Sequence, residues 1–574
     1  MQLTVNPAFS QTATDAIAPE ITTAVTVKNN GKPVSGKKWM VSIANPHAAL
    51  AARMILKGGG NAIDAAITAQ FVLGLVEPQS SGLGGGAFLV YFDAKTKEIV
   101  TLDGRETAPL AATPQLFQNQ KGEPLKFFDA VVGGRSVGTP GTPALLWEMH
   151  TRWGATPWQK LIMPALLMSE RGFIVSQRLA ALVKKNAKTL SYHPATAAYF
   201  LPNSTPIMQG QLLQNNDYAN TLRSLHDSNS VKPFYHGSIA KSIVATVREF
   251  IPNSGVLSST DLSSYRIKQR PPVCGTYRSH QVCGMGPPSS GALTVGQILG
   301  MLQPFDLKSL GPKSPTSWRL IGDASRLAFA DRGRYMADSD YVPMPTKGLL
   351  KPSYLRTRSS LLQADKALET IAPGKPEWDH AQLQADDEAI ELPSTTHFSI
   401  VDQDGNAVSM TSTIENGFGS RLMVGGFLLN NELTDFSFRT HRDGYPIANR
   451  IEPGKRPRSS MAPTIVLKNK KPVLIIGSPG GSRIIGYVAK TIIAHLDWEM
   501  DIQKAISLPH LVNRFGTYDL EAGTQAEALK PELEALGYTV RVLDLNSGLH
   551  GIAIKPDHLE GGADPRREGI VLAE

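Results

Sequence analysis

A run of hairpin-like strands between residues 395 and 476 most constrains the fold of this chain, because a glycine-rich turn and a helical pattern at 483 to 496 follow it directly. Hairpins pair neighbouring strands antiparallel, whereas a parallel sheet needs a crossover helix between successive strands. The pattern therefore predicts sheets covered by helices rather than alternating strand–helix units. We expect an α+β protein.

The first part of the chain is dominated by helical patterns. Residues 46 to 56 have apolar side chains at helical spacing and stop at a Gly-Gly-Gly run, after which Asn61 is placed to cap a second helix ending near Val76. The apolar run 87 to 92 follows a second glycine-rich segment and has the character of a buried strand. Further helices are expected at 141–152, 158–171, 177–188, 236–250, 292–303 and 315–334.

Composition narrows the class of protein. With 574 residues, 41% hydrophobic and 19% charged, the chain is long enough to bury several cores' worth of apolar surface. Residues 1 to 37 are rich in Thr, Ala, Asn and Lys without an amphipathic period, so we expect a tail or an extended surface arm. The start lacks the basic and apolar regions of a signal peptide, and there is no run of 18 apolar residues, so no membrane span is expected.

The charge pattern gives no support to nucleic-acid binding, and the two cysteines leave two states open. The formal charge of +8 is scattered along the chain, which favours a solvated basic surface and gives no indication of nucleic-acid binding. The only two cysteines, Cys274 and Cys283, flank an expected hairpin. They would form a disulfide if the protein is exported, or remain two small buried residues if it is cytosolic. Both alternatives stay open.

Two motif matches are set aside on their context. Gly82 to Ala87 fits the dinucleotide-binding fingerprint, but the glycines follow a helix and precede a strand, the reverse of the required order. Gly134 to Gly138 fits the nucleophile elbow of α/β-hydrolases, with Ser136 as nucleophile, but a stiff Pro-rich loop follows instead of a helix. There is no Walker, H-E-x-x-H or C-x-x-C pattern to support phosphate or metal chemistry.

Two hydroxyl residues, Thr395 and Thr396, stand at the start of the first hairpin strand. A cut before Thr395 would create an N-terminal threonine whose Oγ attacks while its own α-amine accepts the proton. Threonine pairs are also common at strand starts, because β-branched side chains fit a pleated surface. On their own, these residues therefore favour an ordinary strand start over a catalytic threonine. The choice between the two depends on the rest of the sequence.

Hairpin geometry brings another hydroxyl to this position. If Asp404-Gly405 is a two-residue turn, Thr413 lies opposite Thr396; with a three-residue bulged loop it lies opposite Thr395. In either register Thr413 is beside the candidate nucleophile. The glycine-rich turn at 477 to 483 leads from a strand into a helix, where backbone N–H groups would stabilise an oxyanion.

Polar segments after the hairpin contain the mixture that holds a zwitterionic amino-acid head group, namely carboxylates, arginine and paired serines. The candidates are Glu415, the segment Asn430–Asp435 with Glu432 and Asp435, and the segment Arg456–Ser460 with the serines Ser459 and Ser460.

At this point the chain resembles the γ-glutamyltransferases (γ-glutamyltranspeptidases) of the N-terminal-nucleophile hydrolase superfamily, from about residue 40 to the end. The segments that carry the resemblance are Lys57–Ala66, Glu77–Gly86, Asp103–Pro109, Thr395–Asp435, Lys455–Met461 and Gly477–Arg483. The resemblance implies a four-layer αββα sandwich that cuts itself between Ser394 and Thr395. The expected products are a large subunit with its folded part at 38–394 and a small subunit at 395–574, forming a heterodimer.

The resemblance also implies an activity and its residues. Thr395 would take the γ-glutamyl group of glutathione or a related amide and pass it to water or to an amino-acid or peptide acceptor, with no cofactor and no metal. The resemblance implies that the substrate carboxylate is bound by Arg105, Ser459 and Ser460, and its ammonium by Glu415, Glu432 and Asp435. It also implies that Gly480 and Gly481 stabilise the oxyanion and that Thr413 supports the nucleophile. Because members of the family are often periplasmic or secreted, we expect the same location for this protein.

Two departures from the family pattern bear on specificity. Members carry Asn or Glu at the position of Glu415, and some carry Gln where this chain has Glu432. The segment from Phe438 to Gly454 is shorter than in members with a lid over the pocket, so we expect a reduced or absent lid.

Two other functions are weighed against the γ-glutamyl one. A cephalosporin or glutaryl acylase uses the same nucleophile, but its substrate lacks the α-ammonium and would leave Asp435 buried without a partner. An uncut, inactive binding protein that keeps the fold is the other alternative.

Overall fold

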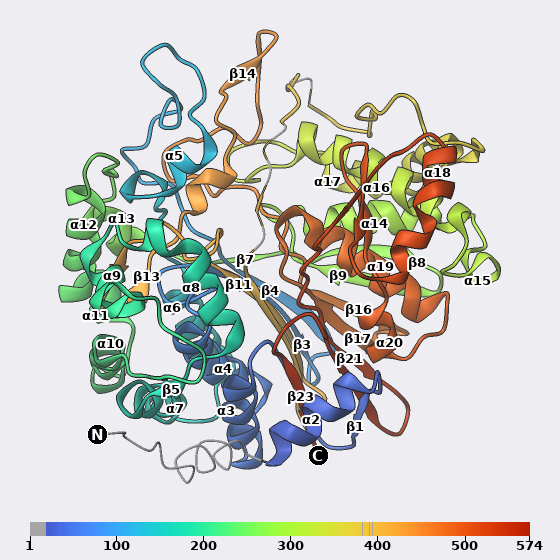
Figure 1. Cartoon of the computed structure of the whole chain (residues 1–574). Helices are drawn as coiled ribbons and strands as arrows, with labels where there is room; N and C mark the ends of the chain where they lie inside the picture. Colours follow the sequence, from blue (N-terminus) through green and yellow to red (C-terminus); the bar gives the residue numbers. More distant parts are fainter. Residues whose placement is uncertain (1–18, 381–382, 388, 390, 393) are drawn as a thin grey trace, which may run out of the picture.

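Two seven-stranded antiparallel sheets lie at the centre of the molecule, with helices on the outer side of each (Figure 1). The computed structural model describes residues 19–380, 383–387, 389, 391–392 and 394–574. The first sheet consists, in spatial order, of β23 (Ile570–Ala573), β2 (Met40–Ile43), β10 (Thr396–Val401), β11 (Ala407–Thr413), β3 (Gly86–Asp93), β4 (Glu98–Gly104) and β7 (Lys268–Arg270).

The second sheet is assembled in the same manner from segments far apart in the sequence. Its strands, in spatial order, are β1 (Val34–Gly36), β22 (Leu559–Ala563), β21 (His550–Ile554), β17 (Lys471–Gly477), β16 (Thr464–Lys468), β9 (His280–Gly284) and β8 (Val273–Tyr277). Both sheets therefore combine strands from before and after residue 395.

Serine side chains join the two sheets where their inner faces meet. The Oγ of Ser42 donates to Gly562 O at 2.7 Å, that of Ser399 to His550 O at 3.0 Å, and that of Ser409 to Ile476 O at 3.2 Å. Buried backbone carbonyls that accept such bonds avoid the cost of desolvation without a partner. These contacts fix the register of one sheet on the other.

Helices α3 (Pro46–Lys57), α4 (Ala62–Val76), α6 (Thr142–Trp153) and α7 (Trp158–Arg171) cover the outer face of the first sheet, and α14 (Gly291–Leu302), α16 (Pro315–Tyr335) and α19 (Ile484–Leu496) cover that of the second (Figure 1). In β3, Leu89 and Tyr91 pack with the first set of helices, whereas Phe88 and Val90 pack between the sheets. Because both faces of β3 are buried, its sequence is a continuous apolar run.

The remaining elements connect these layers. The other helices are α2 (Pro19–Asn29), α5 (Phe127–Val131), α8 (Gln177–Leu190), α9 (Pro194–Phe200), α10 (Asn216–Asp227), α11 (Lys232–His236), α12 (Ser238–Glu249), α13 (Ser259–Ser264), α15 (Leu307–Leu310), α17 (Thr346–Leu349), α18 (Pro352–Ser360), α20 (Ile502–Ser507) and α21 (Lys530–Ala535). The other strands are β5 (Phe173–Ile174), β6 (Leu212–Leu213), β12 (Met423–Val424), β13 (Phe427–Leu428), β14 (His441–Arg442), β15 (Tyr445–Pro446), β18 (Leu511–Asn513), β19 (Thr517–Glu521) and β20 (Thr539–Leu543).

The expected α+β class is confirmed, and so is the cap of the second helix. Asn61 accepts from the N–H of Asp64, whose side chain accepts from the N–H of Asn61 in return. This reciprocal cap satisfies donors that a helix start leaves without intrahelical partners.

The expected N-terminal arm is wrong for the part that the structure describes. Residues from Pro19 form α2, and β1 pairs with β22. The Lys28 ammonium at the end of α2 is buried and donates to the carbonyls of Arg567 and Gly569 at 2.9 and 2.8 Å. These contacts lie more than 500 residues away in the sequence, so composition of the segment gave no sign of them. Residues 1–18 lie outside the described residues.

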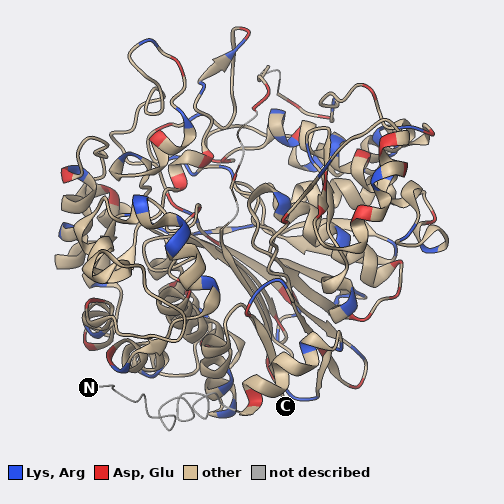
Figure 2. Ribbon diagram, in the orientation of Figure 1, with Lys and Arg blue, Asp and Glu red and all other residues tan. Residues whose placement is uncertain are grey.

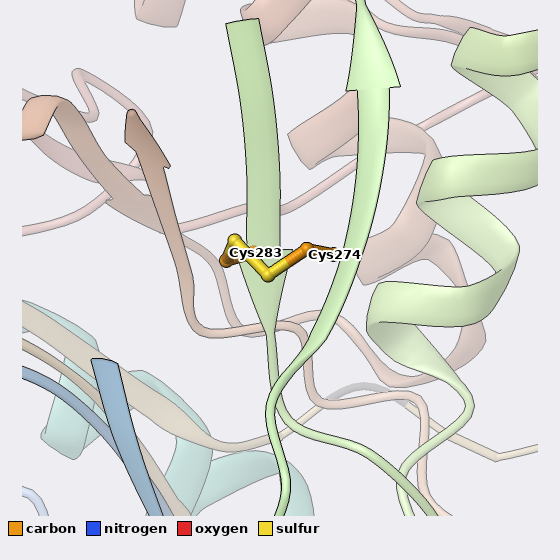
Figure 3. The surroundings of a disulfide bond; sticks show 2 residues. All are labelled: Cys274 and Cys283. Carbon is orange, nitrogen blue, oxygen red and sulfur yellow. A yellow bond between two sulfur atoms is a disulfide. The ribbon is translucent and has the colours of Figure 1, made fainter. Parts of the chain in front are cut away.

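Cys274 and Cys283 form a disulfide between the paired strands β8 and β9 (Figure 3). The structure thus has the first of the two states that the sequence left open. Lys and Arg residues are distributed over several elements in Figure 2, in keeping with positive charge scattered along the chain. Of the helices within the described ranges, none has both the length and the apolar character needed to cross a bilayer.

The structure gives no support to the dinucleotide-binding and nucleophile-elbow motifs that were set aside in the sequence. The glycines at 82 to 86 lie between α4 and β3, so a helix precedes them and a strand follows. Ser136 ends a 3-10 turn, is fully buried, and its Oγ donates to Val131 O at 2.6 Å. A hydroxyl held in this way has a structural role.

Candidate active site

The hairpin of β10 and β11 brings Thr413 to Thr395. Thr396 pairs with Ser412 and Val401 with Ala407, so the next pair in this register is Thr395 with Thr413. The two Oγ1 atoms are 3.1 Å apart, within hydrogen-bond distance. The three-residue bulged alternative is therefore confirmed. Thr413 Oγ1 also accepts from the N–H of Glu415 at 2.8 Å, which holds the hydroxyl in place beside Thr395.

The peptide bond before Thr395 is held from both sides in a strained conformation. Thr395 has φ of 92°, a value that a β-branched residue adopts only under constraint. Its carbonyl accepts from Arg567 Nη1 at 3.1 Å, while Ser394 Oγ donates to Gln79 O at 2.8 Å and Thr396 Oγ1 donates to Glu77 Oε2 at 3.0 Å. These bonds come from two separate segments, the loop after α4 and the loop between β22 and β23, and keep the strained bond beside the Thr395 hydroxyl.

Gly480 and Gly481 lie where β17 turns into α19, with φ of 140° and 58°. The backbone before the predicted cut site runs against this turn: a Cβ on Gly481 would lie 2.5 Å from Glu391 O, and Ser482 N–H reaches the same oxygen at 3.4 Å. Only glycine permits this approach. The predicted oxyanion groups thus lie against the segment that leads to the predicted cut site, and their catalytic role stays a prediction.

An acid cluster lies beside the threonine pair. Glu432 and Asp435 are in one 3-10 turn, and both bind the Arg105 guanidinium, Asp435 through Nη2 at 2.5 Å. Arg105 Nη2 also donates to Arg458 O at 3.0 Å and its Nε to Pro457 O at 3.2 Å. The structure therefore brings together the predicted residues Arg105, Glu432 and Asp435, with the arginine paired to the acids.

Glu106 and Glu415 add two further carboxyl groups to this cluster: Glu106 also pairs with Arg105, at 3.8 Å, and Glu415 lies close enough to Asp435 and Glu432 to interact with their charges. Glu415 binds Asn431 Nδ2 and accepts from Leu392 N–H at 3.3 Å. Burial raises the pKa of Glu106 to about 8, and raises the pKa of Glu415, Glu432 and Asp435 well above the usual range. Neighbouring carboxylates raise these pKa values further, Asp435 in the case of Glu415.

Several oxygens of this cluster have no hydrogen-bond partner among the described residues: both of Glu106, Oε2 of Glu432 and Oδ1 of Asp435. Buried acceptors without partners are costly, and negative charge without compensation more so. The arrangement is therefore suited to bind a cation that brings its own N–H donors.

The paired serines occupy a separate wall of the site. Ser459 O accepts from both N–H and Oγ of Ser290, and Ser460 Oγ accepts from Arg332 Nη2 at 2.8 Å. Arg332, buried in α16, was missed by the sequence reasoning because its position fits an ordinary helical pattern. Its acid partner Glu391 was missed as well, since the segment before the cut has no periodicity.

A hollow of about 540 Å³ adjoins the acid cluster. Its apolar side is formed by α5 and the residues after Asp435, and its described lining includes Phe127, Phe128, Leu392, Phe436 and Phe438. The short hairpin β14–β15 stands at its edge (Figure 1). The reduced or absent lid expected over the pocket stays a prediction.

The raised pKa of Glu415 predicts a pH-dependent stability difference. In a Thr395→Ala background, Glu415→Gln is expected to gain thermal stability relative to its parent as pH rises from about 5 to 8. A carboxyl whose folded pKa exceeds its unfolded one binds more protons when folded, so its ionisation destabilises the fold with rising pH. The cost is about 1.4 kcal/mol for each tenfold difference between the acid dissociation constants of the folded and unfolded states. Differential scanning calorimetry at the two pH values measures it.

The control for this prediction is Glu249→Gln, which removes an exposed carboxylate of α12. Its difference from the parent should be the same at both pH values. A Glu415→Gln difference that is flat or reversed across the range would show that Glu415 is not held with a raised pKa.

Comparison with known protein families gives a match over most of the chain. The family model described as Gamma-glutamyltranspeptidase matches residues 48–574. The glutathione hydrolase proenzyme of Bacillus subtilis strain 168 is 37% identical over 550 residues, covering 94% of this chain and 92% of that protein.

Acylases are similar to nearly the same extent. The Acylase ACY 1 proenzyme of Pseudomonas sp. strain SE83 is 33% identical over 551 residues, covering 94% of both chains. The crystal structure of a cephalosporin acylase from Bacillus halodurans matches with a TM-score of 0.83 at 26% identity, over 95% of this chain and 97% of that one. Overall similarity thus leaves the choice of substrate to the residues of the site.

Proposed function

The chain belongs to the γ-glutamyltranspeptidase family, and on that premise we propose that it cuts itself between Ser394 and Thr395 and then hydrolyses or transfers γ-glutamyl amides such as glutathione. The relatives named as proenzymes accord with a two-part mature protein. Two antiparallel sheets flanked by helices support a four-layer N-terminal-nucleophile hydrolase fold. The proposed cut gives a large subunit ending at Ser394 and a small one beginning at Thr395.

Self-cleavage begins when Thr395 Oγ attacks the Ser394 carbonyl carbon. The C–N bond breaks as the Thr395 nitrogen gains a proton, so the acyl group moves from nitrogen to oxygen and forms an ester. Water then hydrolyses the ester to a Ser394 carboxylate and a free Thr395 hydroxyl and amine. The strained φ of Thr395 and its 3.1 Å contact with Thr413 support this step, because strain is relieved when the peptide bond opens.

Transfer uses the same oxygen on a new carbonyl. Thr395 Oγ attacks the δ-carbon of the γ-glutamyl amide while the freed α-amine takes its proton, and the oxyanion forms at Gly480 and Gly481. The leaving amine receives the proton, and a γ-glutamyl ester remains on Thr395. Water or the amino group of an acceptor then attacks this ester and regenerates the threonine. Every step is acyl transfer, so the proposal needs no cofactor and no metal.

The uncompensated acid cluster is the observation that carries the choice of substrate. A γ-glutamyl donor has an α-ammonium group with three N–H donors, and Asp435 and Glu432 each have a buried oxygen without a hydrogen-bond partner among the described residues. A glutaryl group has a methylene at that place and would leave these acceptors unsatisfied.

A cephalosporin or glutaryl acylase is the second candidate. The structural match to a cephalosporin acylase and the identity to an acylase proenzyme favour it. Comparing kcat/KM on a γ-glutamyl anilide and on the glutaryl anilide of the same aniline decides between the two. Faster cleavage of the glutaryl anilide would refute the γ-glutamyl proposal.

Asp435→Asn sharpens this comparison within one protein. We expect kcat/KM for the γ-glutamyl anilide to fall about 10- to 100-fold, the cost of losing one charged hydrogen bond, while glutaryl cleavage falls less than about 3-fold. Steady-state kinetics on both anilides measures the ratio, and loss of active protein cancels from it. Equal losses on both substrates would mean that Asp435 does not bind the ammonium.

A location outside the cytoplasm is part of the proposal. The Cys274–Cys283 disulfide supports it, because disulfides persist in oxidising compartments. Fractionation of the native host, with the activity assayed in each fraction, tests it, and activity confined to the cytoplasm would contradict it.

A further inference from the structure

Seven lysines line a cleft of about 850 Å³ at the end of the two sheets away from Thr395, which we call the lysine cleft. Turns of both sheets form it, those that follow β1, β3, β10, β16 and β21. Thr395 precedes β10, and the lysine cleft lies beyond the last residue of β10, Val401; at about 3.4 Å per residue the two are about 20 Å apart. Figure 1 shows β1 and the β14–β15 hairpin, which stands at the edge of the hollow beside the acid cluster, at opposite ends of the molecule.

Folding gathers at this cleft positive charge that is scattered along the sequence. The 22 residues that line it include seven lysines and three aspartates, so they carry a formal charge of +4, half of the +8 of the whole chain. Asp402 accepts from N–H groups of its own turn, and Asp557 pairs with His558 at 2.8 Å. Since these two aspartates have local partners, most of the lysine charge is uncompensated and attracts anions.

Five of the seven lysines make no ion pair within 4.0 Å among the described residues; they are Lys37, Lys97, Lys468, Lys470 and Lys471. The other two, Lys38 and Lys555, pair with glutamates. All five unpaired lysines are exposed to water. A single small anion gains little from such a group, whereas a chain of linked anions contacts several of them at once and releases its counterions.

Two of these five lysines occupy turn positions to which lysine is poorly suited. Lys97 has φ of 60° and Lys470 has φ of 62°, in the left-handed region where a Cβ crowds the backbone and where glycine, asparagine and aspartate are the usual residues. Both side chains are exposed and have no ion-pair partner among the described residues. Packing therefore does not account for lysine at these positions, whereas attraction of an anion does.

The lining of the lysine cleft favours a polymer over a membrane or a nucleic acid. Its apolar residues Phe92 and Val401 are buried, and it exposes no large apolar side chain that would enter a bilayer. It also exposes no Phe, Tyr or Trp on which nucleic-acid bases would stack.

From these observations we propose that the lysine cleft binds an extended polyanionic chain. Because the cleft lies at the far end of β10 from Thr395, a bound polymer leaves the candidate active site open to small substrates. The proposal goes beyond acyl transfer and does not depend on it.

Binding of long-chain inorganic polyphosphate to the full chain tests this proposal, with fluorescence anisotropy of the labelled polymer as the readout. With the value for single strands, five lysines give a slope of log affinity against log salt of about −3.5, so the affinity should fall about 100-fold between about 50 and 200 mM salt. Orthophosphate at the same phosphate concentration should not displace the polymer. Absence of binding at the lower salt, or displacement by orthophosphate, overturns the proposal.

Lys97→Asn combined with Lys470→Asn removes two charges and gives both turns a residue that tolerates positive φ. Thermal unfolding should therefore occur at the same temperature as in the unaltered protein or higher, which shows that the variant is folded. Its affinity for polyphosphate should fall about 25-fold at about 0.1 M salt, and the slope should drop to about −2, because two fewer phosphates are neutralised. An unchanged affinity and slope overturn the proposal.

Lys184→Gln combined with Lys185→Gln is the matched control, since it removes two exposed lysines of α8 and leaves the same net charge. Its affinity should stay within about 2-fold of the unaltered protein. Equal weakening by both double variants would show attraction to net charge alone, and binding to anionic phospholipid vesicles without binding to polyphosphate would show membrane contact. Either result overturns the proposal. Binding is measured without turnover, so failure of the proposed function is seen separately.

Discussion

Thr395→Ala is expected to leave the purified chain as one 61.9 kDa species on a denaturing gel, whereas the unaltered protein gives two fragments, residues 1–394 and 395–574. The substitution removes the oxygen that attacks the Ser394 carbonyl, and it also removes the nucleophile for every later turnover. Activity on a γ-glutamyl anilide should fall to the background of the assay, a loss of about 10⁴-fold or more. Intact mass and N-terminal sequencing locate the cut.

Ser136→Ala is the control for this result, because Ser136 lies in the other nucleophile motif and its Oγ is held by Val131 O. Ser136→Ala should be cut and active. Two fragments from Thr395→Ala, or an uncut but active unaltered protein, would refute the proposed maturation. A single uncut and inactive species from the unaltered sequence would favour a binding protein that keeps the fold.

Thr413→Val is expected to slow both self-cleavage and turnover about 10²-fold. Valine keeps the shape of threonine, so the change removes only the hydroxyl that contacts Thr395 Oγ1 and accepts from Glu415 N–H. Loss of one oriented partner at a reacting centre typically costs about 2.7 to 4 kcal/mol, or 10²- to 10³-fold. A time course of the uncut band gives the first rate, and active-site titration of the cut fraction gives the second.

Thr411→Val is the matched control, since Thr411 lies two residues earlier on the same face of β11 and bonds His397 rather than Thr395. It removes an equally buried hydroxyl and should cut at a rate within a few-fold of the unaltered protein. If both variants slow cleavage equally, the effect comes from the buried strand and not from the contact with the nucleophile.

The sequence predicted most of the secondary structure because its helices carry local signals. The expected helix at 158–171 corresponds to α7, and the expected helix at 315–334 to α16, within one residue. In both helices, apolar side chains repeat at helical spacing over several turns, which makes the helices recognisable in the sequence. Helix α2 escaped prediction because it lacks an amphipathic period and is held by the buried Lys28, a contact with the far end of the chain.

The candidate site, like the secondary structure, could be predicted only where local sequence signals specify it. The neighbourhood of Thr395 and Thr413 followed from strand pairing, but the choice between two registers depended on the turn at Asp402 to Asn406, for which both lengths are common. The pairing of Arg105 with acids and of Arg332 with Glu391 depends on elements far apart in the sequence. No local pattern encodes such ion pairs; the family resemblance assigned Arg105 to the substrate carboxylate, and that assignment stays a prediction.

Because strands of the two proposed fragments interleave in both sheets, the proposed cut would break the continuity of the chain without separating its parts. In the first sheet β10 and β11 lie between β2 and β3, and in the second four strands of the small fragment lie between β1 and β9. Neither fragment could be withdrawn without opening long rows of backbone hydrogen bonds on both sides. The unbroken chain therefore acts as a template for its own assembly, holding the two halves at high effective concentration until the sheets close. Once they have closed, the bond at 394–395 is dispensable for structure, and the two halves, made as separate chains, are not expected to reach the same state.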